Sequence, residues 1–546
     1  MMPISRRNLL ITGAAAAGTL ILPRFAIGQA ARPSITIAVQ QVSNSASLEP
    51  LREQSNVGAR IFSSIYDKLI NENLPASLDP VPGLAERWTR IDDRTLELDL
   101  RQGVRFHNGD EMTADDIVFT FGAERMFGDG YVADSNATLF TDVVVRDTTG
   151  GKELPPEVVA VAKRNWPSLE RVEAVDKYKV RFVNRTPDVT LEGRLARSGS
   201  DIVSQRGFAD AATWLDWARQ PVGTGPYKVV EFLPDQRLVL EAHDDYWGGR
   251  PPLETITLVV VPEVASRVNG LFSGEFDLIG DMPPDQIDAI EANPAFEVQG
   301  GLIPNHRLTV FDKNHPQLAD PRIRRAMTHS IDRQAIVDSI WSGRTRVPPG
   351  LQWEFYGPMF VEGWTVPEYD LAMAQALVKE AGYQGEPIPF RVLNNYYTNQ
   401  VSTAQILVEM WRSAGLNIEI EMKENWQQIF DRNTPRAVRD WSNSAPFSDP
   451  VSSIVNQHGP NGQQQQSGEW TNEEMNTLSV SLETEVDMGR RKTMFERMLV
   501  ICEREDPAYT VLHQNATFTG KRKDIQWQAA PSFAMDFRAG NFAIGA

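Results

Sequence analysis

The chain has 546 residues, of which 41% are hydrophobic and 23% are charged, and its formal net charge is −18. This length predicts two or three domains, and the composition excludes both a disordered chain and an integral membrane protein. The first thirty residues carry three arginines and no acid, so the remainder stands at −21. Such acidity argues against a nucleic-acid partner, since little basic surface is left to neutralise phosphates.

The N-terminus has the pattern of an export signal. Arg6 and Arg7 precede a continuous apolar run, and small residues follow it. A charged start, an apolar stretch of about 14 residues and a small-residue exit are typical of a cleaved signal and too short for a membrane anchor. The paired arginines, with Ser before and two Leu after, resemble a twin-arginine signal. We predict a signal peptide at 1–30, cleaved after Ala30 or Gly28, and a periplasmic mature chain without membrane insertion.

The first half of the chain alternates short strands, turns and helices. Asn108-Gly109 is a strong turn signal, and Thr113 with Asp116 can cap the free amides that begin a helix. An irregular insertion is predicted at 128–172. We expect strands at 35–40, 95–100, 104–106, 223–230, 237–241 and 256–261, the last buried on both faces, and helices at 56–69, 84–88 and 113–121.

The middle of the chain carries the clearest pattern of elements. Residues 302–311 predict a strand that ends in a polar turn. Asp320 and Pro321 then open a helix, because Asp can accept backbone N–H bonds and Pro at the first helical position loses no needed donor. Asp332 can cap a second helix, and Gly343 is placed to end it.

The last third predicts a βαβ unit, with a strand at 390–393, a helix at 401–414 and a strand at 416–420. Such a rhythm implies a parallel sheet. Around this unit we expect helices at 369–383 and 477–501, a polar surface loop at 462–467 and a strand at 508–518.

The sequence offers no recognisable catalytic or metal-binding motif. Cys502 is the only cysteine, which excludes an intramolecular disulfide and predicts a buried helical thiol. The seven histidines are not paired at ligand spacing, and neither a nucleophile elbow nor a phosphate loop is present. We therefore expect a protein that is not an enzyme and needs no cofactor or metal. An exported hydrolase, either a glycosidase or a peptidase, stays the alternative, because 72 carboxylates guarantee chance pairs.

Several strings of the chain resemble one known family. Asp320-Pro-Arg-Ile-Arg-Arg-Ala-Met-Thr-His-Ser-Ile-Asp-Arg333 is the most specific of them. Leu84-Ala-Glu-Arg-Trp88, Leu100-Arg-Gln-Gly-Val-Arg-Phe-His-Asn-Gly109, Thr113-Ala-Asp-Asp-Ile-Val-Phe119 and Gly223-Thr-Gly-Pro-Tyr227 accompany it. Together they resemble the family 5 extracellular solute-binding proteins, the peptide- and nickel-type receptors of bacterial ABC importers. The resemblance spans essentially all of the mature chain.

The resemblance implies an α/β architecture of the type 2 periplasmic binding proteins. Two lobes joined by crossing strands are expected: lobe I at 31–303 with an inserted subdomain at about 76–210, lobe II at 304–508, and a return to lobe I at 509–546. The implied function is to bind a peptide or other small polar solute and deliver it to the permease subunits of an ABC importer. We expect a monomer whose lobes close on the ligand like a Venus flytrap, and a sensory solute receptor is a further alternative.

The candidate ligand site combines strand ends with a family comparison. In open α/β sheets ligands lie beyond the carboxyl ends of the strands, and two such ends combine aromatic rings with amides and hydroxyls. The loop after the first strand lies at the mouth of the cleft in the resembling family. The predicted ligand-binding residues are Asn394, Tyr396, Trp441, Asn443 and Ser444 on one side and Ser43 and Asn44 on the other.

The resemblance also bears on the kind of ligand. In dipeptide receptors an arginine near the position of Asn394 binds the peptide carboxylate, and an aspartate three residues after the tryptophan aligned with Trp441 binds the amino group. Here these positions are Asn394 and Ser444. Since a buried charged terminus without its counter-charge costs several kcal/mol, we expect a solute other than a free dipeptide, with longer peptides still possible.

Overall fold

The computed structural model describes residues 32–73, 78–128, 147–148, 152–197, 199–394 and 396–545. The predicted signal peptide and part of the predicted insertion at 128–172 lie outside these ranges. Within them, Pro33 and the residues that follow belong to one compact unit. None of the helices in these ranges is both long and apolar enough to cross a membrane.

A ten-stranded mixed sheet is the largest sheet of the described chain, and its strand order is β10-β11-β12-β1-β13-β18-β14-β17-β15-β16. The predicted βαβ unit is confirmed, since β15 and β16 pair in parallel and α13 (Gln400–Ser413) connects them. The strands are β1 (Ser34–Val39), β10 (Tyr227–Leu233), β11 (Arg237–Ala242), β12 (Thr255–Val260), β13 (Leu278–Ile279), β14 (Phe296–Phe311), β15 (Ile388–Leu393), β16 (Ile418–Lys423), β17 (Val438–Ser444) and β18 (Tyr509–Arg522).

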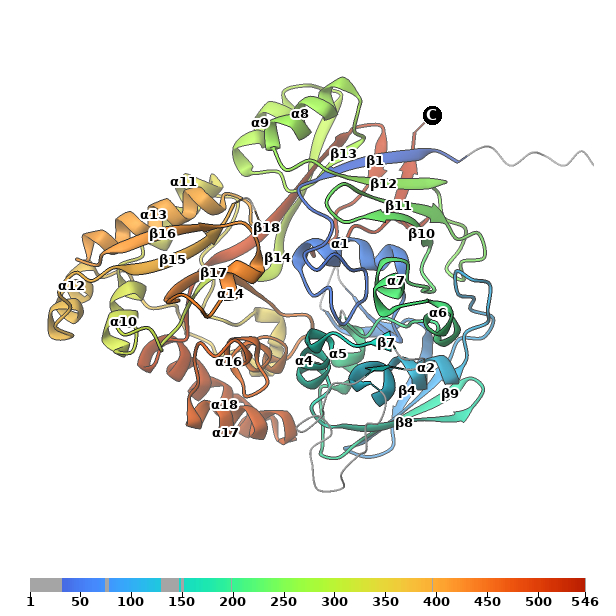
Figure 1. Cartoon of the computed structure of the whole chain (residues 1–546), viewed down its shortest axis with the longest axis horizontal. Coiled ribbons are helices and arrows are strands. Elements are labelled where there is room, and N and C mark those ends of the chain that lie inside the picture. The colour runs from blue at the N-terminus through green and yellow to red at the C-terminus, as the bar shows by residue number, and fades with distance from the viewer. Residues whose placement is uncertain are drawn as a thin grey trace, which may run out of the picture. The chain divides into compact units, whose positions relative to one another are not determined.

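Two long antiparallel strands, β14 and β18, run between the two halves of this sheet (Figure 1). Their pairing extends from Phe296 opposite Arg522 to Val310 opposite Tyr509. Gly300 allows the close approach, because a Cβ at this position would lie 2.0 Å from the Thr517 carbonyl oxygen, and its φ of +132° disfavours other residues. The chain therefore crosses twice at the same place.

Separate apolar cores surround the two halves of the sheet. The first core contains side chains from Ile35 to Leu258 and again from β19 (Ile525–Trp527) to Phe542, so both ends of the described chain contribute to it. Two further cores are built mainly from residues after Phe296. We call the elements around the first core the first lobe, and β15–β17 with the helices from α10 to α18 the second lobe. The exact lobe boundaries remain a prediction.

A smaller antiparallel sheet, β4-β5-β9-β8, lies within the first lobe. One prediction is wrong here: in the helix expected at 84–88, residues 85–88 belong to strand β4. The spacing of Leu84 and Trp88 fits either element, and pairing with β5 decides in favour of the strand. These strands are β4 (Ala85–Arg90), β5 (Thr95–Leu100), β8 (Leu169–Asp176) and β9 (Lys179–Asn184).

The predicted helix starts are confirmed where a polar cap is available. Asp320 and Asp332 accept N–H bonds from Arg322 and Ala335. They begin α10 (Pro321–His329) and α11 (Arg333–Trp341). The remaining helices used below are α1 (Asn56–Ile65), α2 (Ala114–Thr120), α4 (Pro156–Asn165), α5 (Leu191–Ala196), α6 (Gln205–Asp210), α12 (Leu371–Glu380), α14 (Trp426–Phe430), α15 (Ile454–His458), α16 (Gln463–Gln466), α17 (Glu473–Thr484) and α18 (Met488–Val500).

Further predictions differ from the structure. The run at 462–467 contains α16 rather than a surface loop, and Gln464 is buried with its amide N–H groups donated to the carbonyls of Phe311 and Ala508. The single helix predicted at 477–501 is two helices, α17 and α18. Residues 104–106 form an isolated bridge instead of a strand, and β12 alternates between buried and partly exposed residues.

Candidate functional site

A cavity of about 1310 Å³ has walls from both lobes. This exceeds the roughly 300–1,000 Å³ usual for pockets that hold small ligands. The first-lobe side comprises the loop before α1, α1 itself, one face of α4 and the residues after α5. The second-lobe side comprises the loop after β15, α14, the end of β17 and the helices α15 and α16. A C-terminal segment, residues 528–541, closes a further side.

An aromatic cluster forms much of the second-lobe wall. The Trp426 ring lies edge-on to Tyr396 at 4.9 Å and to Trp441 at 4.8 Å between centroids, and Tyr396 meets Tyr397 at 4.6 Å. Edge-to-face contacts of this kind fix ring orientation. Phe430 completes the cluster, beside Trp426 and Trp441. We call these five residues the aromatic wall; its exposed ring faces and edges can cover apolar parts of a ligand.

Two buried arginines support the aromatic wall from behind. The Arg307 guanidinium lies 3.5 Å from the Tyr397 ring centroid, and that of Arg439 lies 4.4 Å from the Trp441 centroid. Each has its own carboxylate: Arg307 pairs with Asp440, and Arg439 makes a two-point pair with Glu469 at 2.6 and 2.7 Å. Their charges are therefore compensated inside the protein.

Burial raises the pKa of Asp440 to about 6, although Arg307 and the Gln400 amide act in the opposite direction. Burial also raises the pKa of Tyr397 to about 12, so its hydroxyl stays protonated at neutral pH. The aromatic wall itself therefore carries no charge.

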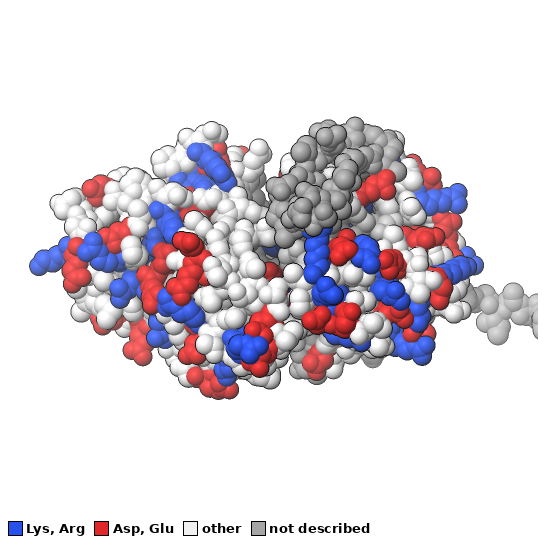
Figure 2. All heavy atoms as spheres, turned by 90° about the horizontal axis from the view of Figure 1, so that it is seen from below, with Lys and Arg blue, Asp and Glu red and all other residues white. Residues whose placement is uncertain are grey.

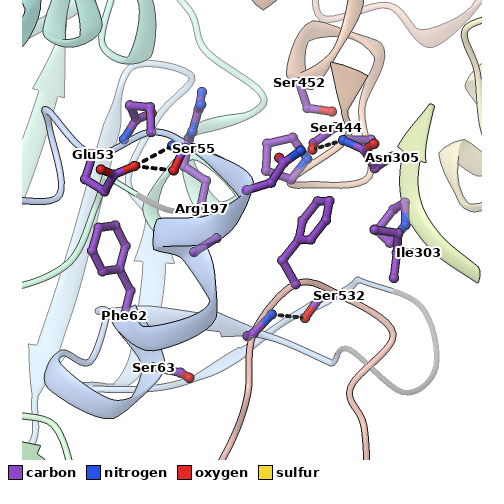
Figure 3. Close-up of a pocket in the computed structure, with 18 of the residues that line it drawn as sticks. Glu53, Ser55, Phe62, Ser63, Arg197, Ile303, Asn305, Ser444, Ser452 and Ser532 are labelled. Carbon is purple, nitrogen blue, oxygen red and sulfur yellow. Dashed lines mark hydrogen bonds between the residues drawn. The ribbon is translucent and has the colours of Figure 1, made fainter. Parts of the chain in front are cut away.

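The crossing strands add a polar strip next to the aromatic wall. Asn305 on β14 stands opposite Ser444 on β17, and its amide donates to the Ser444 hydroxyl at 2.7 Å (Figure 3). Asn443 is buried, with its amide 3.4 Å from the Ser453 carbonyl oxygen. These groups can exchange hydrogen bonds with polar parts of a ligand.

On the first-lobe side, the Glu53 carboxylate organises the loop before α1. It accepts hydrogen bonds from the backbone amides of Asn44 and Ser45 and from the Ser43, Ser45 and Ser55 side chains. The Asn44 Oδ1 atom is buried and has no partner within the described residues, so it is available to a ligand donor. Glu53 itself has its acceptors occupied and serves to hold the loop.

Contacts between the lobes enclose the cavity. Gln40 donates to the Tyr396 carbonyl oxygen at 2.5 Å, and Asn56 donates to the Ser442 hydroxyl at 3.2 Å. Farther along, Arg194 pairs with Glu483 on α17 at 2.8 Å. The lobes are thus in direct contact around the cavity.

The structure separates the seven predicted ligand-binding residues into two groups. Asn44, Tyr396, Trp441, Asn443 and Ser444 line the cavity. Asn394 is exposed and is not among the lining residues, and Ser43 is buried behind them, bonded to Ser47 and Glu53. Whether any of the seven binds a ligand remains a prediction.

Sequence reasoning missed several of the lining residues. Asn305 lies on the predicted strand at 302–311, and the strand's crossing position could have indicated it. Arg164 on α4 and Arg197 directly after α5 are far from either strand end, and no local motif marks them. The segment 528–541 is brought to the cavity only by the return of the chain after β18.

No metal centre is formed by the described residues: nowhere in them do three or more His, Cys, Asp or Glu side chains gather as possible ligands. His107 and His243 do lie ring to ring at 5.1 Å, but burial lowers the pKa of both, to about 3 for His107. Cys502 is a buried free thiol, as predicted.

The described part of the face shown in Figure 2 has no patch of a single charge sign. Acidic and basic side chains are interspersed over the described residues visible in Figure 2.

Comparisons with known proteins agree with one another. The family model of the bacterial extracellular solute-binding proteins, family 5 Middle, matches residues 79–464. The dipeptide-binding protein of Escherichia coli K12 is 24% identical over 490 residues, covering 85% of this chain and 86% of the relative. The dipeptide-binding protein of Pseudoalteromonas sp. SM9913 in complex with Met-Leu superposes with a TM-score of 0.79 at 20% identity, covering 93% of this chain and all of that one. The binding protein MoaA of A. tumefaciens R10 in complex with mannopinic acid gives a TM-score of 0.77, also at 20% identity, over 94% of this chain and all of its own.

Proposed function

The chain belongs to the bacterial extracellular solute-binding proteins of family 5, and from this premise we propose that it captures a polar organic solute, peptide or peptide-like, in the cavity between its lobes. The family is one of substrate-binding proteins of ABC transporters and not of enzymes, so the hydrolase alternative is dropped. The bound solute is delivered to the permease subunits of an importer. The protein acts in the periplasm after its signal peptide is removed.

One observation carries the proposal: a single cavity has a neutral aromatic wall on the second lobe, with hydrogen-bonding groups beside this wall and on the first lobe. Ring faces cover the apolar surface of a solute, while Asn44, Asn305 and Ser444 contact its polar groups. A cavity of about 1310 Å³ favours a ligand larger than a dipeptide.

The lobe contacts around the cavity support a closing motion. Gln40–Tyr396, Asn56–Ser442 and Arg194–Glu483 each join one lobe to the other. Opening the cavity would break them, and a ligand that bridges both walls would favour the closed arrangement.

The test is a thermal-shift screen of the mature chain against peptides of two to eight residues, sugar–amino acid conjugates, nickel–histidine and haem. A ligand that binds the folded state raises Tm by mass action. Small-angle scattering with and without each hit then measures closure, and uptake of the hit should stop when the permease genes are deleted. If no compound shifts Tm, or if a hit is turned over, the proposal is wrong.

A further inference from the structure

One end of the cavity lies between α4 and α5 of the first lobe. Along α4, Glu157, Ala160, Val161 and Arg164 line the cavity, which is the spacing of one helix face. Arg197 follows α5 directly and lines the same cavity. Figure 3 places Arg197 on the same side as Glu53 and Ser55, across from Ser444 and Asn305. Two guanidinium groups therefore face this end.

Neither guanidinium has an ion-pair partner in the part of the chain that the structure describes. Only 8% of Arg197 is exposed, and its Nε and Nη1 atoms are buried without a hydrogen-bond partner there. Arg194, three residues earlier, shows the usual arrangement: it pairs with Asp188 at 3.1 Å and with Glu483 at 2.8 Å. Single unpartnered nitrogens also occur on arginines that have a carboxylate, such as Arg307 and Arg439, whereas Arg197 has two of them and no ion pair within the described chain. Its charge is therefore left uncompensated by the described residues, which is costly.

The two arginines also repel one another. Burial lowers the pKa of Arg197 to about 9, and the neighbouring charges of Arg164 and Arg194 act in the same direction. Burial lowers the pKa of Arg164 to about 10. Both groups remain cationic at neutral pH, and two like charges in a partly desolvated site favour the arrival of an anion.

The acids at this end do not supply that anion. Burial raises the pKa of Glu72 to about 7, although Lys68 and Arg197 act in the opposite direction, so its carboxyl is partly protonated at neutral pH. Asp201 accepts the Gly199 amide and has Lys68 as its neighbouring cation. Glu157 is exposed and two helical turns from Arg164, about 10 Å along the axis.

The second lobe presents amides toward the same space. Asn456, Gln457, Gln463 and Gln466 line the cavity, and Gln466 donates to the Ala160 carbonyl oxygen on α4 at 3.3 Å. The Gln457 Nε2 atom is buried and has no partner among the described residues. The second lobe therefore adds side-chain amide donors to the two guanidinium groups at this end.

We propose that this end of the cavity is an oxyanion subsite, in which Arg164 and Arg197 hold a carboxylate or phosphate group of the bound solute. The inference rests on the proposed function and narrows its ligand class to anionic solutes whose neutral body lies on the aromatic wall. The subsite also supplies a charged anchor on the first lobe. The two second-lobe positions that are charged in dipeptide receptors, Asn394 and Ser444, are neutral in this chain. Planar guanidinium groups suit such oxyanions because they can donate two parallel hydrogen bonds.

The experiment compares matched acid and neutral probes by calorimetric titration of the mature chain. The pairs are a tetrapeptide acid and its carboxamide, a sugar-acid–glutamine conjugate and its amide, and a sugar phosphate and the parent sugar. The anionic member of at least one pair should bind about tenfold tighter or more. Arg164→Gln and Arg197→Gln should each reduce this preference to less than about threefold. Arg206→Gln, which removes one charge from the exposed face of α6, should leave it unchanged.

A second readout separates ligand binding from a structural role. Because an unpaired buried charge destabilises the fold, Arg197→Gln should raise the Tm of the ligand-free protein while weakening binding of the anion. A lowered Tm together with an unchanged acid preference would overturn the subsite. Equal affinity for acid and neutral probes would overturn the subsite alone and leave the proposed function standing. Failure of every probe and of the wider ligand screen to bind would overturn both.

Discussion

Two pairs of arginines near the cavity have opposite surroundings. Arg307 and Arg439 in the second lobe each contact a carboxylate and stack on an aromatic ring. Within the described residues, Arg164 and Arg197 in the first lobe have neither an ion-paired carboxylate nor a stacked ring, and Glu72 acts on Arg197 only through space. A buried arginine whose charge is compensated by an internal carboxylate can hold the aromatic wall in place. A buried arginine without such a partner can instead pair with an anionic group of a ligand.

The largest expected effect comes from breaking a compensated pair. Glu469→Gln should lower the free energy of unfolding by about 3–5 kcal/mol, because it leaves the Arg439 charge buried without a partner. Urea titration followed by circular dichroism measures this. The control is Glu409→Gln in the exposed pair with Arg412, which should change stability by less than about 0.5 kcal/mol. Equal effects of the two variants would show that burial does not distinguish the pairs.

Removing part of the aromatic wall should affect binding next most strongly. Trp441→Ala should weaken binding of a ligand found in the screen by about 2 kcal/mol, as truncation of a buried contact aromatic often does. Calorimetric titration of the folded variant gives the value. Trp88→Ala on β4 removes a ring that packs on the first core but does not line the cavity, so it should alter stability and leave affinity unchanged. If the affinity of Trp441→Ala is unaltered, the aromatic wall does not contribute to ligand binding.

A smaller effect is expected from the ion pair between the lobes. Glu483→Gln weakens the contact with Arg194 but leaves Arg194 paired with Asp188. Affinity should fall by about 1 kcal/mol, because a charge-assisted hydrogen bond of the closed form is lost. Small-angle scattering at saturating ligand should still show closure. The matched control is Glu474→Gln, because its partner Arg497 is in the same lobe. If Glu474→Gln loses as much affinity as Glu483→Gln, the pair of Arg194 with Glu483 is not a contact of the closed form.

The smallest effect concerns the pH dependence of stability at Glu72. Its pKa is about 7 in the folded protein and about 4.5 when unfolded, so the folded state holds more protons between these values. The free energy of unfolding should therefore fall as pH rises from about 5 to 8. The full pKa shift corresponds to roughly 3 kcal/mol, and solvent screening of this partly exposed side chain reduces the expected fall to about 1 kcal/mol. Glu72→Gln should remove this part of the slope. Urea titrations at pH 5 and pH 8 measure the change in the free energy of unfolding for the native chain and for Glu72→Gln. An equal change in the two proteins would show that Glu72 is not buried in solution.

The mixed α/β fold and much of the element order could be predicted from the sequence and its family resemblance. Caps such as Asp320 and Asp332 and the βαβ rhythm at 390–420 depend on neighbouring residues alone, and local chemistry decides them. Predictions failed where two elements share one local pattern. The helix expected at 84–88 gives way to a strand because residues from Ala85 onward pair with β5. The Gln464 amide is buried because the carbonyls of Phe311 and Ala508 accept its hydrogen bonds.

For the cavity, the sequence by itself determined the part that lies at strand ends, where Tyr396, Trp441, Asn443 and Ser444 follow from the topology of an α/β sheet. The tertiary structure alone decided the part made by helices and by the returning chain. Arg197, Arg164 and residues 528–541 are far apart in sequence and reach one cavity only through long-range packing. Whether a charged residue is paired is likewise a property of three-dimensional neighbours, because Coulomb energy and desolvation depend on distance and burial and not on sequence position.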